Sequence, residues 1–281
     1  STAIDPVEAI ADVAEREGIW LHVDSAYAGV VALLPDRREP FRGWERADSI
    51  VVNPHKWLFT PIDTSLLLTR RFDVVRDAFS LVPEYLRTTG GGTSGRDYNE
   101  YTPQLGRRFR ALKVWMQLRY FGIDGLRSRI EEHLDMAARL AAIIDADPDA
   151  ERLAPVPFAT LCFRWRPARF AGQEADPAVA ARLDALNETL MARINATGEA
   201  FLSHTKLGGR YTIRLAIGNP RTEWRHVERT WDLVRTIGRE LDAAAGLCDD
   251  ARPGCPRCPM GRAAGVARRP AGRPGCLRRD R

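Results

Sequence analysis

A carboxylate and a lysine, whose chemistries are complementary, follow two short apolar runs of this sequence. Asp24 comes directly after the run at residues 19–23, and Lys56 comes shortly after the run at residues 49–52. Both runs are apolar and rich in β-branched residues, as is typical of buried strands in a parallel sheet. Ligands of open α/β sheets bind at the carboxyl ends of the strands. We therefore expect both side chains to face one site.

A lysine amine and a carboxylate in one site are the groups that a pyridoxal cofactor requires. The lysine condenses with the cofactor aldehyde as a Schiff base, and the acid keeps the pyridine nitrogen protonated. The positive ring accepts the electron pair that is left when a substrate bond at Cα breaks. The opposite charge of the ring also keeps a buried acid ionised. For a lone aspartate or lysine, however, a turn cap or a solvated loop residue is the more common role, so the surrounding sequence must decide.

Three long segments around these residues occur in a fixed order and resemble the signature segments of the group II pyridoxal-dependent decarboxylases. The resemblance covers residues 1 to about 245 and is nearest to the aromatic-L-amino-acid decarboxylase branch. It implies an α/β, aspartate-aminotransferase-like fold (fold type I) with pyridoxal 5'-phosphate (PLP) as the cofactor. The segments are His22-Val23-Asp24-Ser25-Ala26-Tyr27-Ala28-Gly29, Asn53-Pro54-His55-Lys56-Trp57-Leu58 and the eleven residues from Leu105 to Trp115.

The resemblance implies a role for each matching position. Lys56 corresponds to the lysine that holds the cofactor as a Schiff base, and Asp24 to the acid paired with the pyridine nitrogen. Ala26 corresponds to a small residue packed near the ring. His55 matches a histidine near the cofactor and the reacting substrate, and Asn53 matches an asparagine close to the phosphate. The alternative for His55 is a core histidine with satisfied hydrogen bonds, and for Asn53 a residue that shapes the following turn.

Two further residues are candidates for supporting or catalytic roles. His22 alternates with buried strand positions, so we expect it to support the site rather than to catalyse. Tyr85 lies in a segment, residues 82–86, that resembles the catalytic loop of the family, whose tyrosine protonates the carbanion after CO₂ leaves. The glycine-rich residues 90–95 predict a flexible loop, and lids are a common function of such loops. The alternative for Tyr85 is a packing residue of the lid.

The resemblance implies decarboxylation of an L-amino acid to the amine and CO₂, and it favours an aromatic amino acid as the substrate. Relatives that convert amino acids to aldehydes typically have phenylalanine at the position of Tyr85, so this tyrosine favours a plain decarboxylase. Other PLP reactions on the same scaffold, such as glutamate decarboxylation or aldehyde synthesis, stay open. A truncated product without activity is also open, because the sequence lacks an initial methionine and the N-terminal part of the family, which supplies most of the substrate pocket. The family implies a homodimer with a small-molecule amino-acid substrate.

Composition argues against several other classes. The chain has a formal charge of +5, but residues 251–281 contain nine arginines and one acid, so residues 1–250 are mildly acidic. These arginines lack interleaved aromatic residues and a folded platform, which disfavours nucleic-acid binding. No apolar run of about 18 residues and no signal-like N-terminal segment occurs, so we expect no membrane association and a cytoplasmic location. Cys255 and Cys258 form a lone CxxC that lacks the second half of a zinc site, and we expect no metal.

The elements that must position the site form two predicted units and a tail. Residues 1–147 are interpreted as the C-terminal part of the PLP-binding large domain, residues 148–247 as a small C-terminal α/β domain, and residues 248–281 as a disordered tail rich in Arg, Pro, Gly and Cys. Periodicity and turn residues predict the individual elements. The predicted helices are 5–17, 106–121, 123–146, 176–196 and 222–245, and the predicted strands are 19–23, 49–52, 64–69, 160–165, 199–204 and 211–217.

Overall fold

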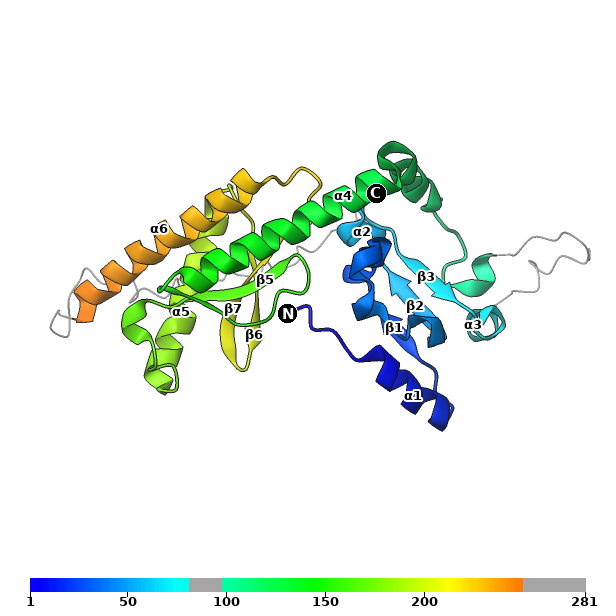
Figure 1. The fold of residues 1–281 in the computed structure, drawn as a ribbon, viewed down its shortest axis with the longest axis horizontal. Helices are drawn as coiled ribbons and strands as arrows, with labels where there is room; N and C mark the ends of the chain where they lie inside the picture. Colours follow the sequence, from blue (N-terminus) through cyan, green and yellow to red (C-terminus); the bar gives the residue numbers. More distant parts are fainter. Residues whose placement is uncertain (81–97, 250–281) are drawn as a thin grey trace, which may run out of the picture.

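The computed structural model describes residues 1–80 and 98–249 as a mixed α/β structure with two sheets (Figure 1). No helix in this described part is long and apolar enough to cross a membrane. The helices are α1 (Val7–Glu17), α2 (Pro54–Trp57), α3 (Phe72–Phe79), α4 (Ala111–Ala146), α5 (Pro177–Ala196) and α6 (Trp224–Asp249). The strands are β1 (His22–Asp24), β2 (Ser49–Val52), β3 (Leu66–Thr69), β4 (Ala150–Arg152), β5 (Thr160–Trp165), β6 (Ser203–Leu207) and β7 (Arg210–Ala216).

The N-terminal sheet has the order β1-β2-β3 and contains one parallel pair. Strands β1 and β2 are parallel, with Asp24 opposite Val51, whereas β3 is antiparallel to β2. Because β1 and β2 run in the same direction, the segments that follow them leave from one edge of the sheet. This arrangement confirms the expectation that the two signature segments start at a common edge.

Two details at the start of the chain differ from the prediction. Strand β1 begins three residues later than expected, because the Leu21 N–H donates to Asp48 Oδ2 (2.9 Å) instead of to a neighbouring strand. Ile19 is accordingly 59% exposed. The helix predicted over residues 5–17 begins two residues later, at Val7, with Pro6 at the cap position and no side-chain capping bond.

The second sheet has the order β4-β5-β7-β6 and is antiparallel throughout. The prediction for strand β5 is confirmed with the same bounds, and all six of its residues are buried. Helix α5 begins after Asp176, whose side chain accepts the Ala178 N–H as an N-cap (2.7 Å). Cys162 of β5 is 1% exposed, which confirms that it is a small buried residue of the core.

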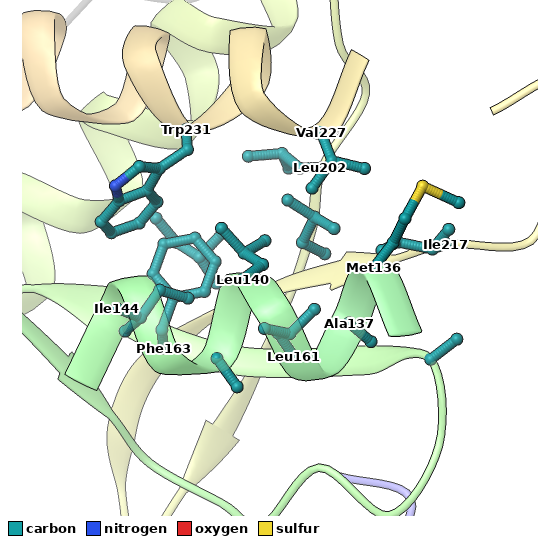
Figure 2. Close-up of a cluster of buried hydrophobic side chains, with 14 of the residues drawn as sticks. Met136, Ala137, Leu140, Ile144, Leu161, Phe163, Leu202, Ile217, Val227 and Trp231 are labelled. Carbon is teal, nitrogen blue, oxygen red and sulfur yellow. The ribbon is translucent and has the colours of Figure 1, made fainter. Parts of the chain in front are cut away.

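Helix α4 connects the two sheets and contributes to a core that both share. Gly122 has non-helical backbone angles (φ 66°, ψ 174°) and divides α4, as the sequence predicted, although the first part starts at Ala111 rather than at Gly106. Figure 2 shows side chains of the second part, among them Leu140, beside those of β5 and α6. One apolar cluster contains this helix, the second sheet and also Trp57 next to the N-terminal sheet. The proposed boundary near residue 148 thus stays a prediction, because the core continues across it.

Candidate active site

A cavity of about 490 Å³ lies beside the carboxyl end of β1 and holds the two residues from which the prediction started. Asp24, Ala26 and Lys56 all line it. Asp24 ends β1, Ala26 follows it, and Lys56 follows β2, so the parallel pairing of these strands brings the three residues together. Four aromatic side chains form part of the remaining wall, among them Phe41 and Phe158, whose rings stack with centroids 6.3 Å apart.

Asp24 is the last residue of β1, and only one of its two carboxylate oxygens accepts a hydrogen bond from the described residues. Its Oδ1 accepts the backbone N–H of Ala26 (3.0 Å), a bond that turns the chain away from the sheet. Its Oδ2 has no hydrogen-bond partner among the described residues. Ala26 is buried, at 7% exposure, between this turn and the next element. The carboxylate is therefore fixed by one oxygen and free to accept a donor with the other.

Lys56 lies in the short helix α2, with an exposed side chain. Its backbone N–H donates to the Asn53 carbonyl (2.9 Å), which fixes the first turn of the helix. Within the part of the chain that the structure describes, Nζ makes no hydrogen bond and no ion pair. An amine without a competing partner at the wall of a cavity can condense with a carbonyl compound when it is deprotonated.

His55 and Asn53 do not line the cavity, although they flank Lys56 in sequence. The Thr64 N–H donates to His55 Nδ1 (3.0 Å), and the same nitrogen contacts the Thr64 carbonyl. Asn53 Oδ1 accepts the Ser65 hydroxyl (2.6 Å). Both side chains thus bind the segment that leads into β3. The contacts of His55 match the alternative of a histidine with satisfied hydrogen bonds, whereas the Asn53 side chain bonds to Ser65 and not to the turn that follows it. The roles of both residues at the cofactor stay predictions.

His22 supports the strand pair, in agreement with the sequence prediction. Its Nδ1 lies 2.7 Å from Ser49 Oγ, and the Trp20 indole N–H donates to the same oxygen (2.9 Å). Ser25 donates from Oγ to the Val51 carbonyl (2.8 Å). This hydroxyl therefore ties the segment after β1 to β2.

Two aromatic residues join the signature segments to each other, and the sequence analysis did not identify them. The Tyr27 ring stacks on the Trp57 ring, with centroids 4.9 Å apart and planes 9° apart. The Thr160 hydroxyl donates to Tyr27 Oη (3.1 Å), and burial raises the pKa of Tyr27 to about 12, so it stays a neutral phenol. Their positions in the sequence could have pointed to them, since one directly follows Ala26 and the other directly follows Lys56. Tyr85, the predicted proton donor, lies outside the described residues.

Comparison with known proteins places these features in a family. The pyridoxal-dependent decarboxylase conserved domain matches residues 1–166. Tryptophan decarboxylase TDC1 of Camptotheca acuminata is 39% identical over 84% of this chain and 46% of its own length. Phenylacetaldehyde synthase of Arabidopsis thaliana is 38% identical over the same shares. The crystal structure of Oryza sativa TDC with PLP and tryptamine has a TM-score of 0.76 at 38% identity, covering 86% of this chain and 49% of that one.

The chain spans about half the length of these relatives. The matched domain nevertheless contains β1, β2 and the complete set of described cavity residues around Asp24 and Lys56. The order and spacing of the signature segments, their common cavity and the domain match agree with one another. The chain belongs to the pyridoxal-dependent decarboxylase family.

Proposed function

We propose that the protein containing this chain uses PLP to decarboxylate an aromatic L-amino acid to the amine and CO₂. The observation that carries the proposal is the common cavity of Asp24 and Lys56. The tryptophan decarboxylase of Camptotheca acuminata and the Oryza sativa structure with PLP and tryptamine support an aromatic substrate. The latter also supports the aspartate-aminotransferase-like fold, of which this chain would supply the C-terminal part of the large domain and a small domain.

The described residues fit this cofactor. Lys56 supplies an unpaired amine for the aldehyde, and Asp24 Oδ2 is free to accept a hydrogen bond from a protonated ring nitrogen. Ala26, with its single methyl group, would pack near the ring. Once bound, the cofactor supplies an electron sink for the bond that breaks at Cα.

Three further residues complete the proposed site. Tyr85 would return a proton to Cα after CO₂ has left, which suits a phenol that meets the substrate only when the site is closed. His55 would lie near the cofactor and the substrate, and Asn53 near the phosphate. The bonds of the latter two to the segment before β3 would hold them in place while the cofactor binds.

The cofactor part of the proposal can be tested by adding PLP to the purified protein. We expect one equivalent to condense with Lys56 with loss of water, seen as visible absorbance and, after borohydride reduction of the imine, as a mass increase of the Lys56 peptide. Lys56→Ala should abolish both signals, whereas Lys113→Ala, at a lysine whose Nζ binds the Ile62 carbonyl (3.1 Å), should change neither. Equal uptake by Lys56→Ala and the unchanged protein would refute the assignment.

Asp24→Asn tests the second half of the site. The variant keeps the acceptor for the Ala26 N–H but loses the charge that faces the cavity. A hydrogen bond to a charged group contributes about 1.5–3 kcal/mol, so cofactor affinity should fall by about ten- to hundredfold. Affinity within twofold of the unchanged protein would show that the carboxylate does not meet the ring.

An aldehyde synthase is the second candidate, because a phenylacetaldehyde synthase is as similar to this chain as a tryptophan decarboxylase. Tyr85 favours the decarboxylase. The assay measures CO₂, amine, aldehyde and peroxide from tryptophan, tyrosine, DOPA, phenylalanine and glutamate. Amine and CO₂ in equal amounts support the proposal, and aldehyde with peroxide and little amine contradicts it. No product from a protein that has bound the cofactor would favour an inactive fragment.

We also propose a homodimer. The start of α4 exposes large apolar side chains, with Trp115 57% and Tyr120 82% exposed, and such surfaces are common at protein interfaces. Sedimentation of the protein should give twice the chain mass, and Tyr120→Asp should lower it; a monomer at micromolar concentration would contradict the proposal. The cytoplasmic location stays a prediction of the sequence.

A further inference from the structure

Helix α2, which carries Lys56, is too short to hold its own position. It has four residues, and its N-cap, Asn53, makes no side-chain capping bond. A single helical turn is not stable in isolation, because the first turn fixes many dihedral angles for one hydrogen bond. The orientation of Lys56 relative to Asp24 must therefore come from contacts that α2 makes with the rest of the molecule.

The most deeply buried of these contacts involves Trp57, the residue directly after the lysine. Trp57 is 0% exposed. Its indole N–H donates to His133 Nδ1 of α4 (2.9 Å), and the two rings are parallel within 1°. On another side the indole stacks on Tyr27, which lies in the signature segment that carries Asp24. Trp57 thus touches both the cofactor-facing turn and the long helix.

His133 is well suited to be a fixed acceptor. It is 2% exposed, and burial lowers its pKa, so the neutral ring that can accept the indole proton is favoured. The nearby Asn219 backbone opposes this lowering of the pKa only in part. The loop containing Asn219 is anchored to α4, because Arg129 Nη1 donates to the Pro220 carbonyl (2.8 Å). A Cβ built at Gly218 in this loop would lie 3.9 Å from the Lys56 carbonyl.

We propose that the buried hydrogen bond between Trp57 and His133 positions the lysine-bearing helix α2 against the turn that carries Asp24. His133 is in this view a positioning residue that acts through Trp57 and does not touch the cofactor. The inference rests on the proposed function for the meaning of Lys56, but the geometry of α2 can be measured without any cofactor.

The variants separate the hydrogen bond from simple packing. His133→Leu removes the acceptor and leaves the indole N–H buried without a partner. His133→Asn places an amide oxygen near the position of Nδ1 and should restore the bond. Trp57→Phe keeps an aromatic ring for the stack on Tyr27 and removes only the donor. Ile130→Ala, at a 0% exposed position one turn earlier in α4, is the control for general destabilisation.

The first readout is hydrogen–deuterium exchange in the protein without cofactor. The Leu58 and Thr60 amides bond to the Pro54 carbonyl (3.1 and 3.2 Å) and report directly on α2. In His133→Leu and Trp57→Phe, their exchange relative to amides of α5 should accelerate by about tenfold or more, the change expected for one lost buried hydrogen bond. In His133→Asn it should stay near that of the unchanged protein, and in Ile130→Ala the ratio should not change.

The second readout is the rate at which PLP attaches to Lys56. It should fall in His133→Leu and Trp57→Phe and recover in His133→Asn. Equal effects in Ile130→Ala, or unchanged exchange at Leu58 and Thr60 in His133→Leu, would overturn the inference. If the exchange result holds but the unchanged protein attaches no PLP at Lys56, the proposed function fails while the positioning of α2 stands.

Discussion

The buried hydrogen bonds of Asn187 in α5 allow the loss of stability on its replacement to be predicted. The ladder between β5 and β7 ends at Phe163 and Ile213, and the backbone of β5 beyond this point needs other partners. Asn187, at 0% exposure, provides them: Oδ1 accepts the Trp165 N–H (2.7 Å), and Nδ2 donates to the Trp165 carbonyl (2.8 Å). One buried amide side chain thus bonds to the β5 backbone where the pairing of β5 with β7 has ended.

Replacing Asn187 with alanine would leave the N–H and the C=O of Trp165 buried without partners. Each such group costs about 1–3 kcal/mol, so the free energy of unfolding should fall by about 2–6 kcal/mol. This is a large share of the roughly 5–15 kcal/mol that holds a typical domain. Because β5 also begins with Thr160, which bonds to Tyr27 beside the site, the same change should weaken cofactor binding.

Urea unfolding followed by circular dichroism measures the change, and Thr189→Ala is the matched control. Thr189 is exposed on the same helix and bonds only to the carbonyl one turn earlier, so its loss should cost less than about 0.5 kcal/mol. A loss below about 1 kcal/mol in Asn187→Ala would refute the reasoning, since it would mean that the Trp165 backbone finds other partners.

Two further predictions concern packing and pH. Gly238→Ala should destabilise by about 1–3 kcal/mol, because a Cβ there would lie 2.6 Å from the buried Trp165 ring, whereas Gly125→Ala, with its nearest contact at 3.6 Å, should stabilise through helix propensity. Thermal unfolding measures both variants: the melting temperature should fall in Gly238→Ala and rise in Gly125→Ala. A lower melting temperature in both variants would contradict the argument. Burial lowers the pKa of His133 from its usual 6.5, so its contribution to stability is present above pH 6.5 and is lost as the pH falls through the lowered folded-state value. The unfolding free energy of His133→Asn should therefore fall less steeply than that of the unchanged protein below pH 6.5; identical slopes would show that His133 is not linked to folding.

Local sequence patterns predicted several of the strands and helices around the site, but not α2, the short helix that carries Lys56. The apolar run of β5 and the cap at Asp176 are signals contained in a few neighbouring residues, and their bounds were predicted closely. The start of β1 was missed because an interaction from outside the run, the Asp48 carboxylate, takes the Leu21 N–H. A pattern of hydrophobic residues contains no information about such a competitor.

In the candidate site, too, local sequence predicted some features, and residues distant in the sequence set the others. The sequence identified Asp24 and Lys56 because they follow strands, and the parallel pairing of β1 and β2 put them at one cavity. It also named His55 and Asn53, but their side chains bind the segment before β3, which sequence neighbours of Lys56 do not reveal. A side chain one position away points in another direction, and only the surrounding packing decides what it meets.

The sequence by itself identified the family and predicted the roles of the lysine and the acid, because these inferences depend on residue types in fixed order along the chain. Tertiary structure alone decided what holds the lysine in place. Trp57 and His133 are separated by 76 positions, and Asn187 meets Trp165 from a different element. A buried polar group must find its partner wherever the chain has brought one. That partner is set by how helices and sheets pack, and no local pattern specifies it.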